Sequence, residues 1–281
     1  MIISVASGKG GTGKTTVAVN LTLSIGDAQL LDCDVEEPNA HLFLNPEVEG
    51  IEPVYVMIPE VDKEKCSFCR KCADFCAFNA LFVIGKDPEK GLEGDTILFP
   101  NLCHGCGGCI FVCPENAISE GKREVGRIIE AKKGDIGVVY GELNIGEPMP
   151  VPVIKAVKSR IDTGRTVIID CPPGTSCPVI HSIHGSDYCI LVTEPTPFGF
   201  HDLKLMVEVV KELDIPFGVV INKEGIGDER VYKYCRSEGI EILAGIPYER
   251  RIAELYSGGI PFVTQIEEWK SKFYEIFEKI R

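Results

Sequence analysis

The sequence predicts an α/β fold with a mostly parallel, doubly wound sheet, interrupted by a small, cysteine-rich α+β domain. Three observations support this prediction. A glycine-rich, phosphate-binding motif at residues 8–16 lies between a predicted strand and a predicted helix. Apolar strand segments alternate with amphipathic helical segments along the rest of the chain, which is typical of a parallel sheet. Eight of the thirteen cysteines lie between Cys66 and Cys113.

The phosphate-binding motif follows a short apolar segment, Ile2 to Ala6. Its spacing, Gly8-x4-Gly13-Lys14-Thr15, is the P-loop pattern. Glycines let backbone N–H groups converge on phosphate oxygens, Lys14 reaches the β- and γ-phosphates, and Thr15 offers a hydroxyl to Mg²⁺. The helix that follows presents its positive N-terminal end to the anion. The expected nucleotide-binding residues are Gly8, Gly10, Gly11, Thr12, Gly13, Lys14, Thr15 and Thr16.

Two acidic residues follow or end predicted buried strands. Residues 29–34 form an apolar strand with carboxylates at its carboxyl end, where ligands gather in open α/β sheets. Asp34 is therefore expected to hold a water or Mg²⁺ near the γ-phosphate, or alternatively to cap the following turn. Residues 166–170 have the Walker B pattern, and Asp170 is expected to hold Mg²⁺ from the side opposite Thr15.

The remaining elements follow from apolar periodicity. Further strands are expected at residues 54–58, 134–140, 189–192, 217–222 and 242–246, and helices at 16–25, 153–161 and 202–213. The C-terminal segment, 266–280, is amphipathic, and the charges on its polar face are balanced. A lipid-binding helix is normally rich in Lys and Arg on that face, so this helix is expected to pack on the sheet.

The cysteine-rich segment contains an internal repeat of 37 residues. Cys66-x2-Cys69-x2-Cys72-x3-Cys76 recurs as Cys103-x2-Cys106-x2-Cys109-x3-Cys113. This spacing is typical of bacterial ferredoxins, in which three cysteines of a run bind one [4Fe–4S] cluster and the fourth binds the other cluster. The expected ligands are Cys66, Cys69, Cys72 and Cys113 for the first cluster, and Cys103, Cys106, Cys109 and Cys76 for the second. Structural zinc is the alternative, although two matched runs of this kind are not a zinc-ribbon pattern.

The abrupt change in composition gives the expected domain boundaries. Residues 1–59 and 126–281 would form one discontinuous nucleotide-binding domain, and 60–125 an inserted ferredoxin domain. The net charge of −13 argues against a nucleic-acid groove or a general affinity for anionic membranes. An odd number of cysteines fits no disulfide framework, and neither a signal peptide nor a membrane span is evident, so the protein is expected to be cytoplasmic.

The P-loop resembles that of the MinD/ParA/nitrogenase-iron-protein group, whose deviant Walker A loop carries an extra lysine, here Lys9. With the cysteine repeat, the chain resembles MinD-superfamily ATPases that contain a ferredoxin domain. This resemblance implies ATP as the nucleotide, and a homodimer in which Lys9 reaches the partner's nucleotide and neutralises charge in the transition state. It also implies Asp34 in switch I, Asp170 in switch II and adenine recognition by Asn222. The expected catalytic residues are Lys9, Lys14, Asp34 and Asp170.

Three functions remain open at this point. The first is an ATPase that couples dimer switching to electron transfer, or to docking of a redox or metal-cofactor-assembly protein. The second is an ATP-dependent carrier of iron–sulfur clusters or metal, in which Cys171 and Cys177 of both subunits could bind a bridging metal or cluster; small buried cysteines are the ordinary alternative. The third is a MinD-like spatial regulator whose clusters sense redox state.

Overall fold

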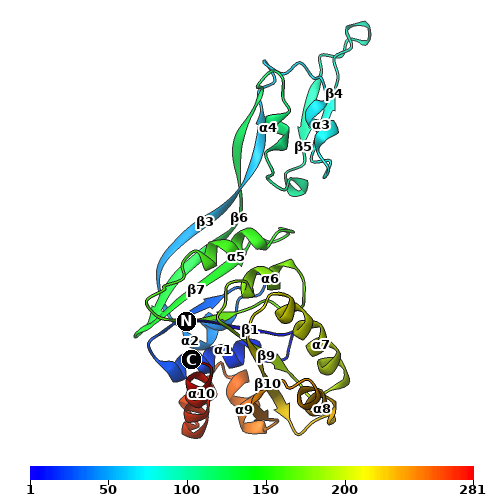
Figure 1. Ribbon diagram of the computed structural model, residues 1–281. Coiled ribbons are helices and arrows are strands. Elements are labelled where there is room, and N and C mark those ends of the chain that lie inside the picture. The colour runs from blue at the N-terminus through cyan, green and yellow to red at the C-terminus, as the bar shows by residue number, and fades with distance from the viewer. The chain divides into compact units, whose positions relative to one another are not determined.

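The computed structural model describes all residues, 1–281. The chain folds into two compact units (Figure 1). The first unit comprises Met1–Glu52, Arg127–Leu143 and Val153–Arg281, and the second comprises Pro53–Gly126 and Asn144–Pro152. The second unit is thus wider than the expected insertion and includes a segment after residue 143. Each unit is described separately below.

The sheet of the first unit is mostly parallel, as predicted. Its nine strands lie in the order β11-β10-β9-β1-β8-β2-β7-β6-β3, and every pairing from β11 to β7 is parallel. The parallel strands are β1 (Ile2–Ala6), β2 (Ala28–Asp32), β7 (Ile136–Leu143), β8 (Thr166–Asp170), β9 (Tyr188–Thr193), β10 (Phe217–Glu224) and β11 (Ile242–Pro247). All seven were expected, with boundaries that differ by a few residues at most.

Helices connect these strands. They are α1 (Lys14–Ile25), α2 (Ala40–Leu44), α5 (Val151–Lys158), α6 (Cys177–Ile183), α7 (Pro197–Glu212), α8 (Arg230–Ser237), α9 (Arg250–Ser257) and α10 (Glu267–Ile280), with a 3₁₀ turn, η3, at Phe262–Thr264. Helix α10 packs against α1, and its side chains Trp269, Phe273, Ile276 and Phe277 are buried in the hydrophobic core. The prediction that the C-terminal helix packs within the fold is therefore confirmed.

Two long strands belong to both units. Strand β3 (Glu47–Val61) extends the expected strand at 54–58 in both directions, and β6 (Ile118–Lys133) begins inside the expected insertion. The sequence analysis missed β6 because charged and glycine residues interrupt its first half, so it contains no continuous apolar run. A domain boundary drawn from composition alone therefore falls in the middle of a strand.

The second unit contains two copies of one small structure. The first copy has α3 (Lys71–Phe75) and β4 (Leu81–Ile84), and the second has α4 (Gly108–Phe111) and the start of β6, each 37 residues later. Strand β5 (Asp95–Leu98) pairs antiparallel with β4. The 3₁₀ turns are η1 (Pro88–Lys90) and η2 (Pro100–Leu102).

The backbone repeats as closely as the cysteines do. Three pairs of equivalent residues have positive φ angles: Phe68 and Gly105 (56° and 65°), Arg70 and Gly107 (68° and 72°), and Asn79 and Asn116 (51° and 49°). Left-handed backbone is unfavourable for Phe and Arg, so the loop conformation around the first cysteines is retained at a local cost. The repeat found in the sequence is therefore also a repeat of structure.

Candidate functional site

The P-loop joins β1 to α1 and is shaped by close backbone contacts. Gly13 caps α1 with φ 96°, a left-handed conformation that favours glycine. A Cβ atom on Gly13 would lie 2.2 Å from Nδ2 of Asn222, and one on Gly8 would lie 2.4 Å from the carbonyl oxygen of Asp202. Neither neighbour leaves room for a side chain, so both positions require glycine for space, and Gly13 requires it for its backbone conformation as well.

Asp170 lies at the end of β8, directly opposite Asp32 of β2 in the parallel register. Both carboxylates are buried, and Lys14 of the P-loop is buried with them. The Thr15 hydroxyl is close enough to lower the pKa of Asp170, but neither carboxylate oxygen has a well-formed hydrogen bond. Burial, followed by the charge of Asp32, raises the pKa of Asp170 well above its usual value, and Lys14 offsets only part of this effect. Two orphaned oxygens beside the P-loop suit a bound cation and its water shell.

Asp32 is a functional residue that the sequence analysis overlooked. Its carboxylate accepts hydrogen bonds from the backbone N–H groups of Asp34, Asn39 and Ala40, each at 3.0 Å. Burial nevertheless raises the pKa of Asp32 to about 6. The loop between β2 and α2 is thus held by Asp32. The signal in the sequence was the pair of aspartates at 32 and 34, of which only the second was considered.

Asp34 stands half-buried one residue beyond Cys33. Its burial, and then the neighbouring Asp32 charge, raise the pKa of Asp34 to about 7. The side chain makes no capping hydrogen bond to the following turn, because Asp32 has that role. Asp34 is therefore available to a water or ligand near the loop, as the first interpretation of this residue requires.

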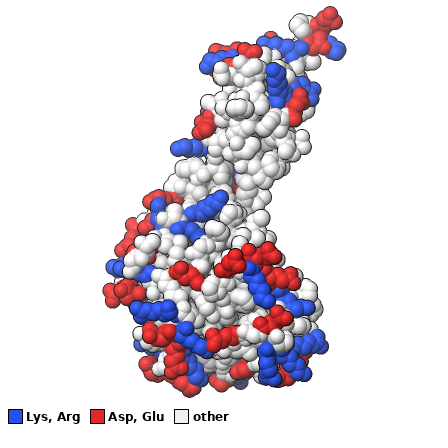
Figure 2. Space-filling view, viewed as in Figure 1, with Lys and Arg blue, Asp and Glu red and all other residues white.

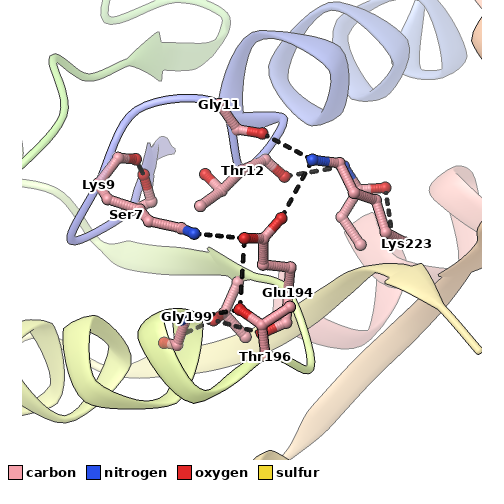
Figure 3. Close-up of polar contacts among 10 residues, drawn as sticks. Ser7, Lys9, Gly11, Thr12, Glu194, Thr196, Gly199 and Lys223 are labelled. Carbon is pink, nitrogen blue, oxygen red and sulfur yellow. Dashed lines mark hydrogen bonds and ion pairs between the residues drawn. The ribbon is translucent and has the colours of Figure 1, made fainter. Parts of the chain in front are cut away.

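Figure 3 shows a polar network on the other side of the P-loop. The Lys9 ammonium forms an ion pair with Glu194, which follows β9, and Lys223 of β10 lies 3.0 Å from the same carboxylate. Lys223 also donates to the carbonyl oxygen of Gly11 at 3.2 Å, and Asn222 donates to that of Thr12 at 2.8 Å. Lys9 is thus bound within its own chain in this structure, and Asn222 supports the P-loop through its amide.

Glu194 and Lys223 were not expected as site residues. Hydrogen bonds from two lysines lower the pKa of Glu194 below its usual value, although burial acts in the opposite direction and is the largest single influence. Sequence spacing did not reveal the network, because its members come from the P-loop and from the ends of two strands far away in the chain. Lys223 directly follows Asn222 in the sequence, but the sequence analysis assigned a role to Asn222 only.

The structure argues against the bridging site at Cys171 and Cys177 that was considered from the sequence. Cys171 is fully buried at the end of β8, and burial raises the pKa of its thiol well above the usual value. Cys177 is exposed at the start of α6. A thiol that is buried in the core, where its protonated form is favoured, is poorly suited to bind a metal at a subunit surface. The burial of Cys171 therefore counts against the bridging site.

The eight cysteines of the repeat line two cavities in the second unit, four cysteines in each. One cavity is lined by Cys66, Cys69, Cys72 and Cys113, and the other by Cys76, Cys103, Cys106 and Cys109. In each case the fourth cysteine comes from the other copy of the repeat. The grouping is the one expected from the sequence, including the crossing of Cys76 and Cys113. Beyond the cysteines, the second cavity has mostly apolar walls, among them Met57, Phe75 and Leu81.

Backbone amides already point toward several of these thiols. The N–H of Ala80 donates to Sγ of Cys76, and that of Ala117 donates to Sγ of Cys113, both at 3.3 Å and at equivalent positions of the repeat. Phe68 donates to Sγ of Cys66 at 3.4 Å. No three His, Cys, Asp or Glu side chains converge closely enough to hold a single metal ion. The thiols instead surround each cavity.

Comparison with known proteins places the first unit in a family. Residues 3–262 match the family described as "CobQ/CobB/MinD/ParA nucleotide binding domain". The chain belongs to this family. It is therefore a nucleotide-binding protein and a P-loop ATPase, as the sequence predicted.

Among the helices of the chain, none combines the length and the apolar composition that a membrane span needs.

Relatives of this MinD/ParA-family chain cover nearly its whole length. An uncharacterized protein of Methanocaldococcus jannaschii is 31% identical over 276 residues, covering 94% of this chain and 91% of the relative. A Pyrococcus horikoshii protein named iron-sulfur cluster carrier protein is 26% identical over 300 residues, covering 99% of this chain and 84% of the relative.

Solved structures show the same fold. The cell division ATPase MinD of Pyrococcus furiosus has a TM-score of 0.57 and 21% identity, with 100% of this chain and 99% of that chain covered. The septum site-determining protein MinD of Pyrococcus horikoshii, complexed with Mg-ADP, has a TM-score of 0.58 and 21% identity, with 99% and 95% covered. The predicted α/β P-loop fold of this MinD/ParA-family chain is therefore confirmed.

The buried aspartates give this MinD/ParA-family domain a characteristic pH dependence. The pKa values of Asp32 and Asp34 are raised from 3.8 to about 6 and about 7, so the folded state disfavours their ionised forms. Their contribution to the free energy of unfolding is full below about pH 4 and is lost as pH rises through 6 to 7. Because Asp34→Asn removes one of these charges, we expect this variant to lose less thermal stability than the native chain between pH 5 and 8. Equal losses in a nucleotide-free melting series would contradict the prediction.

Proposed function

We propose that this chain is an ATP-driven iron–sulfur protein. Mg-ATP binding and hydrolysis at the P-loop would control the docking of a redox or cofactor-assembly protein, and the second unit would be a ferredoxin-like domain with two [4Fe–4S] clusters. The observation that carries the proposal is the sorting of eight repeat cysteines into two cavities, each with three thiols from one copy and the fourth from the other. This is the ligand arrangement of a two-cluster ferredoxin.

The donor set fits such clusters better than it fits single ions. A [4Fe–4S] cluster carries its own sulfide, and its four thiolates bind the corners of a cube, so the ligands must surround a space and not meet at a point. Backbone N–H groups directed at Cys66, Cys76 and Cys113 match the hydrogen bonds that stabilise cluster thiolates. When bound, each cluster would supply a site for reversible one-electron transfer.

The nucleotide half of the proposal assigns roles to the P-loop and its neighbours. Lys14 would bind the β- and γ-phosphates, while Thr15 and Asp170 would hold Mg²⁺. The two orphaned oxygens of Asp170 support this assignment. Asn222, next to the loop, would recognise adenine, and Lys9 would act at the partner's nucleotide in a homodimer. Loop residues Gly8, Gly10, Gly11, Thr12, Gly13 and Thr16 would complete the phosphate cradle.

The second unit also carries apolar surface suited to a protein partner. More than half of the exposed large apolar side chains of the chain lie in this unit, although it is the smaller of the two. Uncharged atoms cover much of it on the face shown in Figure 2. The exposed apolar side chains of this unit include Phe75, Phe78, Phe82, Phe99, Leu102 and Phe111. Concentrated exposed apolar side chains are typical of interaction surfaces.

A carrier function is the second candidate, and the relatives named iron-sulfur cluster carrier protein favour it. In that case ATP would control the handover of a cluster to an acceptor. The buried Cys171 argues against a bridging site at Cys171 and Cys177, so a carrier would have to use the cysteines of the second unit. The spatial-regulator hypothesis lacks a comparable observation, because the apolar face of α10 is buried in the core.

The test is anaerobic analysis of the full chain. We expect about eight iron and eight sulfide per chain. When Mg-ATP is added, we expect either the reduction potential of the clusters or the spin coupling in the EPR spectrum of the dithionite-reduced protein to change. Iron well below this value after reconstitution would contradict the two-cluster assignment. Full iron with identical spectra would contradict coupling to nucleotide. Rapid transfer of iron and sulfide to an apo-ferredoxin acceptor would favour the carrier.

A further inference from the structure

The carboxylate of Glu194 binds two lysines at once beside the P-loop (Figure 3). Its side chain is only 11% exposed; burial disfavours its ionised form, but Lys9 and Lys223 outweigh burial and lower its pKa. The Thr196 hydroxyl, at the start of α7, lies 3.4 Å from the same carboxylate. A buried anion therefore lies next to a loop whose ligand is a polyanion, an arrangement that costs free energy unless cations pair with the carboxylate.

The two lysines are not equivalent. Lys223 donates to Glu194 and also to the Gly11 carbonyl oxygen, whereas Glu194 is the only partner of the Lys9 ammonium. Lys9 is therefore the member of the network with the fewest contacts to lose. Breaking an isolated buried ion pair is costly, because one charge remains buried and uncompensated. Here Lys223 remains on the carboxylate, so release of Lys9 is much less costly.

We propose that Glu194 is a positioning residue for nucleotide binding and hydrolysis, which holds Lys9 within its own chain until nucleotide phosphates compete for the Lys9 ammonium. Lys223 then neutralises Glu194 alone and keeps its contact with the loop at Gly11. The exchange replaces one charge-assisted bond, Lys9 to carboxylate, by another, Lys9 to phosphate. Its free energy is therefore set by the strength of the Lys9–Glu194 contact.

The first test is Glu194→Gln, which preserves side-chain size and removes the charge. With Lys9 no longer held, we expect the apparent affinity for Mg-ATP, measured by calorimetry, to rise about three- to tenfold. KM should fall by a similar factor, with a smaller change in kcat. The same substitution made in a Lys9→Ala background should change neither quantity, because the contact it removes is already absent.

A second variant, taken together with Glu194→Gln, separates this proposal from a purely structural role, because the proposal expects the two to act in opposite directions. Lys223→Gln leaves Lys9 as the single cation on Glu194, so Lys9 is held more tightly and Mg-ATP affinity should fall. If the three side chains only brace the loop, both Glu194→Gln and Lys223→Gln weaken binding, and Glu194→Gln does so equally with and without Lys9. That result would overturn the proposal. Iron content does not enter these measurements, so the outcome is independent of the cluster assignment.

Discussion

Cys113→Ala is expected to remove the cluster of Cys66, Cys69 and Cys72, and to leave the cluster of its own sequence neighbours in place. Iron should fall from about eight to about four atoms per chain, because each [4Fe–4S] cluster needs its fourth thiolate. The reason is spatial: Cys113 lines the cavity of the first three cysteines, although Cys109 is only four residues away in the sequence. Iron and acid-labile sulfide analysis measures the loss.

Double variants identify which cluster is lost. If Cys113 and Cys69 bind the same cluster, the double alanine variant retains as much iron as either single variant. The combination of Cys113→Ala with Cys106→Ala should instead lose nearly all iron, because it damages both cavities. The reverse pattern would show that the fourth cysteines do not cross. Cys177→Ala is the matched control, since that exposed cysteine on α6 belongs to neither cavity and should keep full iron.

The parts of this protein that could be predicted from sequence are those with local signals. The P-loop lies within nine consecutive residues, and the ferredoxin-type repeat is a fixed spacing of one residue type, so both sets of residues could be named without a structure. Apolar runs located the seven parallel strands for the same reason. Even the crossing of Cys76 and Cys113 followed from the known chemistry of the repeat, and the cavities group the thiols in that way.

The residues that were missed act through contacts distant in sequence. Glu194 meets Lys9 across 185 residues, and its ordinary sequence surroundings give no indication of that contact. Asp32 was overlooked because it stands only two residues from Asp34 in the sequence, and only the three backbone hydrogen bonds decide which of them holds the loop. Cys171 was considered a ligand because spacing does not report burial. Partner choice and depth in the fold are tertiary properties, which local patterns do not encode.

Asp170→Asn is expected to lower the rate of hydrolysis and to raise the stability of the nucleotide-free protein. Hydrolysis of Mg-ATP should fall about 100- to 1,000-fold, the effect typical of removing one group that stabilises transition-state charge. The nucleotide-free protein should become more stable at neutral pH, because the amide cannot carry the charge that burial and the neighbouring Asp32 disfavour. Burial, and then the Asp32 charge, raise the pKa of Asp170, so the folded protein without nucleotide disfavours the ionised carboxylate.

Two measurements check this prediction on the same preparation: steady-state hydrolysis with Mg²⁺ in excess, and thermal unfolding without nucleotide. Asp187→Asn is a suitable control, because Asp187 is also an aspartate near the sheet, but its carboxylate accepts a hydrogen bond from the backbone of Ile2 at 2.7 Å. That variant should change stability little, because the Asn amide oxygen can still accept this bond, and it should keep hydrolysis. If Asp170→Asn instead destabilises the nucleotide-free fold, the carboxylate is a structural anchor. A gain in stability with loss of hydrolysis means that the fold tolerates a destabilising charge because the reaction requires it.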